Sequence, residues 1–193
     1  MYIRNMRKFI AVCVFLAAGL CLEAQTLSWD LRFLKGEEME SVPISQIIRL
    51  ENGTFFKVEI VPASDCYCYI ISNDMKRQIS VLFNDQLEDG EEIKLGPFKI
   101  VEPPGFETLY VVMSLERQTR LETLIQDFNN NPGSWQSADN LRREITRLQN
   151  DASRLGEPAS AFIASGGTSR GNDGYVTRFS EKNMYVRSIV IRH

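Results

Sequence analysis

The amino-acid sequence predicts a mainly β (α+β) fold. We expect an antiparallel β-sandwich-like domain of about seven to nine short strands, with two helices in the C-terminal half and a final C-terminal strand. Short alternating or apolar runs, separated by turn-forming residues, fill positions 27–114. The apolar spacing becomes helical between 119 and 155. Strands are expected again over 160–193, and the strongest of them, at 184–191, is expected to pair into the sheet.

The segment before this domain has the pattern of a secretory signal peptide. A basic start is followed by an apolar run at 9–22, and Ala24 provides a small residue at a cleavage point. The apolar run is too short to span a bilayer comfortably. We therefore expect residues 1–24 to be removed on export. Residues 25–193 then form a single β-rich domain in the periplasm or associated with the cell envelope.

Cys21, inside this segment, leaves two interpretations open. It is either a site of lipid attachment, which would anchor the protein to a membrane, or an ordinary cysteine within an apolar signal. Leu20 precedes it, at a position where a lipidated cysteine usually follows a small residue. Contact with a membrane is expected only if Cys21 is lipidated.

The net charge limits the class of partner. The whole chain has a net charge of −3, and removal of the predicted signal, with three cations and Glu23, leaves −5. Nucleic-acid binding needs a concentrated basic face. The sequence therefore argues against a nucleic-acid partner.

The strands before the helices follow from their side-chain patterns. Positions 54–61 alternate between apolar and polar residues, and 66–72 are apolar and aromatic. The next strand is expected to place Ile79, Val81 and Phe83 on one face.

After the acidic turn at 88–92, positions 94–101 predict two short strand pieces divided near Gly96 and Pro97. The run at 108–113 is almost wholly apolar, which suits the middle of a sheet.

Thr119 and Glu122 have the spacing of a capping box, which predicts a helix start. The residues at 129–133 end that helix, and a second helix is expected at 135–155. Its apolar stripe consists of Leu141, Ile145, Leu148 and Leu155. The stripe either packs on the helix's own domain or forms an interface with a helix of another subunit.

The catalytic inventory is sparse. With one histidine, His193, a serine or cysteine triad has no plausible base, and no nucleotide-binding or metalloprotease motif is present. The glycine-rich stretch 166–174 is either a surface loop or an anion cradle, and the acidic stretch 85–92 is either a solvated turn or a calcium loop. We predict no catalytic residue, cofactor or metal, with a carboxylate-dependent hydrolase as the enzymatic alternative.

Two further features are candidates for structure or binding. Cys66 and Cys68, separated by one residue, have Cα atoms ~6.5 Å apart in a strand, near the upper limit for a disulfide, so we expect buried, reduced thiols. Phe55, Tyr67 and Tyr69 are the candidate binding surface, since rings with hydroxyl tips suit ligand contact. They suit a half-buried core equally well.

Four segments carry a family resemblance: 51–55, 65–69, 81–84 and 103–114. They provide, in order, a glycine turn before an apolar strand, an aspartate before a tyrosine-rich strand, a Leu-Phe segment, and a Pro-Gly-x-Glu strand ending near a serine. In this order they resemble the bacterial domain of unknown function numbered 4384, over roughly 41–129. The resemblance implies a compact β-rich domain with an accessory or sensing role in exported proteins, and no site residues are carried over from it.

The sequence thus favours a non-enzymatic exported envelope protein, an accessory binding or interaction module. Its expected partner is another envelope protein or a cell-wall or carbohydrate ligand. The alternative is a structural subunit of an envelope assembly, joined through the second helix.

Overall fold

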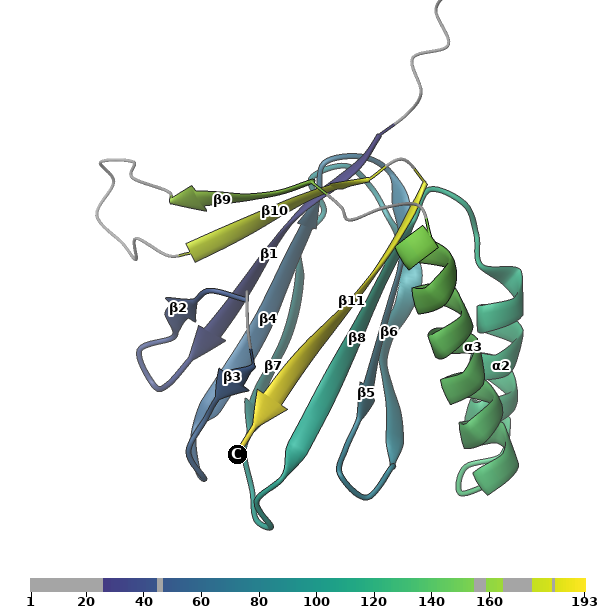
Figure 1. The fold of residues 1–193 in the computed structure, drawn as a ribbon, viewed down its shortest axis with the longest axis horizontal. Coiled ribbons are helices and arrows are strands. Elements are labelled where there is room, and N and C mark those ends of the chain that lie inside the picture. The colour runs from purple at the N-terminus through teal and green to yellow at the C-terminus, as the bar shows by residue number, and fades with distance from the viewer. Residues whose placement is uncertain (1–25, 45–46, 155–158, 165–174, 182) are drawn as a thin grey trace, which may run out of the picture.

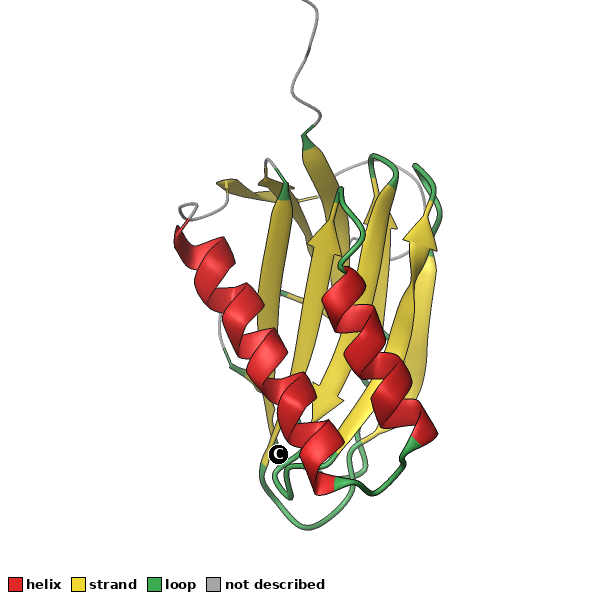
Figure 2. Cartoon of the chain, turned by 90° about the vertical axis from the view of Figure 1, so that its right-hand side faces the viewer, coloured by secondary structure: helices red, strands yellow, loops and turns green. Residues whose placement is uncertain are grey.

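Two sheets lie face to face, and both helices cover the outer side of one of them (Figures 1 and 2). The structure, a computed structural model, describes residues 26–44, 47–154, 159–164, 175–181 and 183–193. The predicted mainly β, sandwich-like fold with two helices and a C-terminal strand is confirmed. The predicted signal peptide and Cys21 lie outside the described residues.

The first sheet has six strands, all antiparallel, in the order β7-β4-β1-β10-β9, with β2 paired to the end of β1. The strands of this sheet are β1 (Leu27–Lys35), β2 (Glu40–Val42), β4 (Phe55–Pro62), β7 (Ile93–Lys99), β9 (Ala159–Ala164) and β10 (Tyr175–Glu181). The alternation predicted for 54–61 is present in β4, whose even-numbered residues are buried.

The second sheet has five strands in the order β3-β11-β8-β5-β6. Its strands are β3 (Ile48–Arg49), β5 (Cys66–Asn73), β6 (Ile79–Leu87), β8 (Phe106–Ser114) and β11 (Met184–Arg192). As predicted, the apolar strand β8 is central and the last strand, β11, pairs into the sheet, antiparallel to β8. β11 also pairs with β3, in parallel.

The described residues form more strands than the predicted seven to nine. The additional elements include β2 and β3, which have three and two residues. Segments this short are too brief to show an alternating pattern in the sequence.

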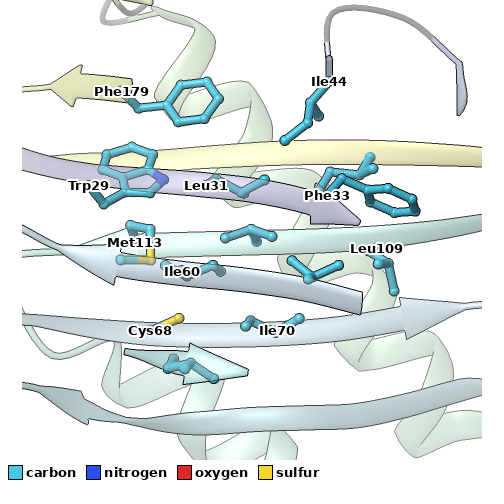
Figure 3. Packing of buried hydrophobic residues seen from close by; sticks show 14 of the residues in the cluster. Trp29, Leu31, Phe33, Ile44, Ile60, Cys68, Ile70, Leu109, Met113 and Phe179 are labelled. Atoms are coloured by element: carbon cyan, nitrogen blue, oxygen red, sulfur yellow. The ribbon is translucent and has the colours of Figure 1, made fainter. Parts of the chain in front are cut away.

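The main core fills the space between the sheets (Figure 3). Alternate residues of β1 point inward, so Trp29, Leu31 and Phe33 meet side chains from the opposite sheet. An aromatic cluster supports one part of this core, since the Trp29 ring lies 5.2 Å from Phe179 and 4.9 Å from Tyr185, measured between centroids. This interior is a packed apolar layer of the kind that stabilises sandwiches.

A β-bulge in β6 overturns one predicted face. Ile70 pairs with Phe83 but the next residue, Ile71, pairs with Val81, so Leu82 is the extra residue. Val81 therefore packs under the helices while Phe83 packs against the core between the sheets. The prediction that Ile79, Val81 and Phe83 share one face was wrong, because the bulge changes the side-chain alternation at Leu82.

A second irregularity corrects the prediction of two strand pieces at 94–101. β7 is one continuous strand that pairs with β4 across a register shift between Phe56 and Val58. At the shift, Gly96 has a φ of 105°, and a Cβ there would lie 2.8 Å from the carbonyl oxygen of Phe56. Glycine thus lets the two backbones approach closely, and the strand bends without ending.

The helices α2 (Thr119–Asn130) and α3 (Trp135–Arg154) pack on the outer face of the five-stranded sheet. Leu141, Ile145 and Leu148 are between 0% and 2% exposed and contact a second core that contains Tyr69 and Val112. For these three residues the stripe packs on its own domain, so they are not available to a partner helix. Leu155, the fourth residue of the predicted stripe, lies outside the described residues.

The predicted capping box is absent. The N-cap of α2 is Gln118, which makes no side-chain capping hydrogen bond, and Thr119 is already the first helical residue. The Glu122 carboxylate instead accepts hydrogen bonds from Tyr69 and Arg117. Glu122 thus contacts Tyr69 of the sheet, and it does not form the predicted cap at the start of its own helix.

A search of the described helices for a membrane span, judged by length and apolarity, finds none.

Truncating Leu148 to Ala tests the role of the stripe. We expect the free energy of unfolding in urea to fall by about 2–5 kcal/mol, because a buried side chain is replaced by a cavity. Asn150→Ala, an exposed change on the same helix, serves as the control and should leave stability within ~0.5 kcal/mol. A change in oligomeric state with no loss of stability would instead assign the stripe to an intermolecular interface.

Candidate binding face

The three residues predicted as an aromatic binding surface do not form one. Tyr67 and Tyr69 lie on β5, in the five-stranded sheet, whereas Phe55 lies on β4, in the six-stranded sheet. Tyr69 belongs to the core under the helices, and Tyr67 packs against that core. The prediction that these three residues share one surface was wrong, because the chain passes from one sheet to the other between β4 and β5.

Tyr69 connects the sheet to the start of α2. Its hydroxyl donates a hydrogen bond to the Glu122 carboxylate, at 2.8 Å, and accepts one from the Gln118 backbone N–H, at 3.0 Å. The other Glu122 oxygen accepts a hydrogen bond from Arg117, at 2.6 Å. Burial is the main reason that the pKa of Tyr69 lies above its ordinary value. These contacts make Tyr69 structural.

Removing the Tyr69 hydroxyl tests this connection. Tyr69→Phe should lower the free energy of unfolding by about 1–3 kcal/mol, because the part-buried Gln118 N–H loses its acceptor and one Glu122 oxygen loses its donor. The raised pKa favours the neutral phenol in the folded state. The contribution of the Tyr69 hydroxyl to the free energy of unfolding is therefore complete below the unfolded pKa of 10.0. It decreases as pH rises from that value towards the folded pKa.

Unfolding curves at pH 7, 9 and 10.5 for wild type, Tyr69→Phe and the exposed Tyr175→Phe provide the measurement. The difference in stability between wild type and Tyr69→Phe should narrow at the highest pH. The result for Tyr175→Phe should match wild type. An unchanged difference at all three pH values would contradict the assigned role.

Cys66 and Cys68 are free, buried thiols on the side of β5 that faces the other sheet, as predicted. Burial, with a smaller effect of the Asp65 charge, raises the pKa of the Cys66 thiol to about 11. Burial likewise raises the pKa of Cys68, together with the nearby Cys66. At neutral pH both side chains are protonated hydrophobic residues of the core.

These thiols should resist alkylation in the folded protein. A pKa of about 11 leaves ~0.1% of Cys66 as thiolate at pH 8, and burial adds a steric barrier. We expect iodoacetamide at pH 8 to label both residues in urea and neither in native protein, as measured by peptide mass mapping. Labelling of native Cys68, or a Cys66–Cys68 disulfide, would contradict this expectation.

The outer face of the six-stranded sheet, here called the open face, has a different character. Among the described residues no helix packs on this face, since α2 and α3 lie on the other sheet (Figure 1). Because inward residues alternate with outward ones, the register determines which side chains lie on it. The open face contains Asp30, Arg32, Leu34, Phe55, Lys57, Glu59, Val61, Lys94, Lys99 and Arg178.

Ion pairs cross the strands of the open face. Arg178 holds Asp30 through two hydrogen bonds of 2.7 Å, which join β10 to β1. Arg32 lies 3.6 Å from Glu59 on β4, and Glu59 stands opposite Lys94 on β7. Cross-strand pairs of opposite charge stabilise neighbouring strands by ~0.2–1 kcal/mol each.

The cations of these pairs project further into solvent than the carboxylates. The side chains of Arg178 and Arg32 are 48% and 47% exposed, against 27% for Asp30 and 13% for Glu59. Lys94 is 59% exposed and also pairs with Glu92 at the rim of the sheet, at 2.8 Å. An approaching ligand therefore meets guanidinium and ammonium groups first.

A hollow of about 360 Å³ lies at one end of the sandwich, between the β1–β2 turn and the β3–β4 turn. Its walls include Lys35, Glu37, Glu38, Glu40, Arg49 and Glu51. Glutamates outnumber cations here, so this hollow is one place in which a pair of catalytic carboxylates would be sought. That alternative stays a prediction.

The acidic stretch 85–92 does not join two strands of one sheet. It contains the end of β6 and the connection from β6 to β7, which belong to different sheets. No cluster of three or more potential metal ligands is found in the described part of the chain. The glycine-rich stretch 166–174 lies outside the described residues.

No protein-family model, curated protein or solved structure matches the chain. The resemblance to the domain family numbered 4384 therefore stays a prediction from the sequence.

Sequence reasoning missed the open face as a unit. The charges on β1 and β4 are visible in the sequence as alternation, and Phe55 lies on the same outward side of β4 as Lys57 and Glu59. The sequence does not show which strands pair with each other. Arg178 and Asp30, for example, form an ion pair although they are 148 positions apart in the sequence.

Proposed function

We propose that this protein is a non-enzymatic, exported envelope protein that acts as an accessory binding module through its open face. One observation carries the proposal: a broad sheet face lies free of described helices, and its cations project above the carboxylates that they pair with. Export follows from the basic and apolar pattern of residues 1–24.

The packing of the rest of the domain supports this choice of surface. The outer face of the other sheet is covered by α2 and α3, and the space between the sheets is filled by apolar side chains. The open face also has rigid support, because β1 is held by β4, β10 and β2. Rigid elements position binding groups more accurately than loops do.

Site-specific cross-linking in intact cells tests the proposal. We expect a photo-reactive amino acid in place of Lys57, on the open face, to give a reproducible adduct with an envelope component, identified by mass spectrometry. The same group in place of Thr123, exposed on α2, is the control and should not give that adduct. Absence of any adduct at position 57, or identical adducts at both positions, would reject the open face as the binding surface.

A further inference from the structure

Resting on the proposed function, we propose that the open face binds a linear polysaccharide that bears carboxylate groups.

The open face has more cations than carboxylates, whereas the protein as a whole has a negative net charge. The whole chain has a net charge of −3. The open face nevertheless has five cations, against the carboxylates of Asp30, Glu59 and the rim residue Glu92. A positive surface on an acidic protein attracts anions locally while it leaves the rest of the molecule repelled by them. The ligand is therefore expected to be anionic.

Donors remain for such a ligand. Within the described residues, neither Lys57 nor Lys99 forms an ion pair. Lys99 lies 5.5 Å from the centre of the Phe55 ring, directly across from it on the neighbouring strand. Arg178 contacts Asp30 through its Nε and Nη2 atoms, which leaves Nη1 outside that bidentate pair.

The arrangement of the cations favours a repeating ligand. They are spread over β7, β4, β1 and β10, four adjacent strands with a spacing of ~4.8 Å. A polymer with a charge on each unit meets several of these cations at once, and linked contacts strengthen one another through effective concentration. A small anion would meet one or two of them.

The apolar residues of the open face favour sugar rings over a membrane. Leu34, Phe55 and Val61 are half-buried between the charges, so they offer flat apolar contact without side chains that would insert into lipid. Peripheral membrane binding combines basic groups with projecting apolar ones. The exposed large hydrophobic residues of the described part of the chain lie elsewhere: Ile47, Met75, Val101, Phe106, Trp135 and Tyr175.

The binding test uses the purified full chain and polygalacturonate, a linear polymer with one carboxylate on each sugar. Dextran serves as the neutral polymer. The test variant Lys57→Gln/Lys99→Gln removes two unpaired cations from the open face. The matched control Lys76→Gln/Arg143→Gln removes two exposed cations from the β5–β6 turn and from α3, so both proteins have the same net charge.

We expect wild type to bind polygalacturonate and not dextran, with an affinity that falls as salt concentration rises. The open-face variant should raise Kd about tenfold or more, equivalent to ~1.4 kcal/mol, and should show a weaker salt dependence. The control variant should bind within about twofold of wild type. Unfolding curves for all three proteins verify that the variants are folded.

Three results would overturn the inference. One is equal loss of binding in both double variants, and another is equal binding to dextran. The third is binding to phosphatidylglycerol vesicles without binding to polygalacturonate. If any of these three results were found together with a protein adduct at position 57 in cells, the proposed function would still hold. The polysaccharide would then be rejected as the ligand. An absent adduct would reject the proposed function itself.

Discussion

The five-stranded sheet has to be covered on both faces, and the rest of the structure depends on that requirement. Its central strands β5 and β8 have apolar side chains on both sides, such as Cys68 and Tyr69, or Val111 and Val112. One side meets the six-stranded sheet and the other meets α2 and α3. Because both helices pack on the five-stranded sheet, they do not cover the outer face of the six-stranded sheet. The asymmetry that makes a binding face possible thus originates in two apolar strands.

Local patterns in the sequence predicted much of the fold. The alternation in β4, the apolar run of β8 and the stripe of α3 at Leu141, Ile145 and Leu148 each depend on neighbouring residues, and each is present as expected. The errors occurred where a distant contact competes with a local pattern. Glu122 hydrogen-bonds Tyr69 in place of capping its helix, and the extra residue Leu82 changes which face Phe83 occupies. Such choices depend on tertiary packing, which single-sequence patterns do not contain.

The candidate site was less predictable than the fold for the same reason. An aromatic strand such as Tyr67-Cys68-Tyr69 suits a binding surface or a core, and the arrival of α2 over β5 decides between them. The open face combines residues from four strands, including β10, which joins β1 from the other end of the sequence. Its character depends on how far each charged side chain projects, which is a property of the assembled sheet.

The two bulges have a consequence for association. β6 and β7 are each the edge strand on one side of their sheet, and each has a register shift near its middle. A strand from another molecule needs a straight run of unpaired N–H and C=O groups to add to an edge, and a bulge breaks that run. The irregularities at Leu82 and Gly96 therefore make these two edges poor templates for a strand from another molecule.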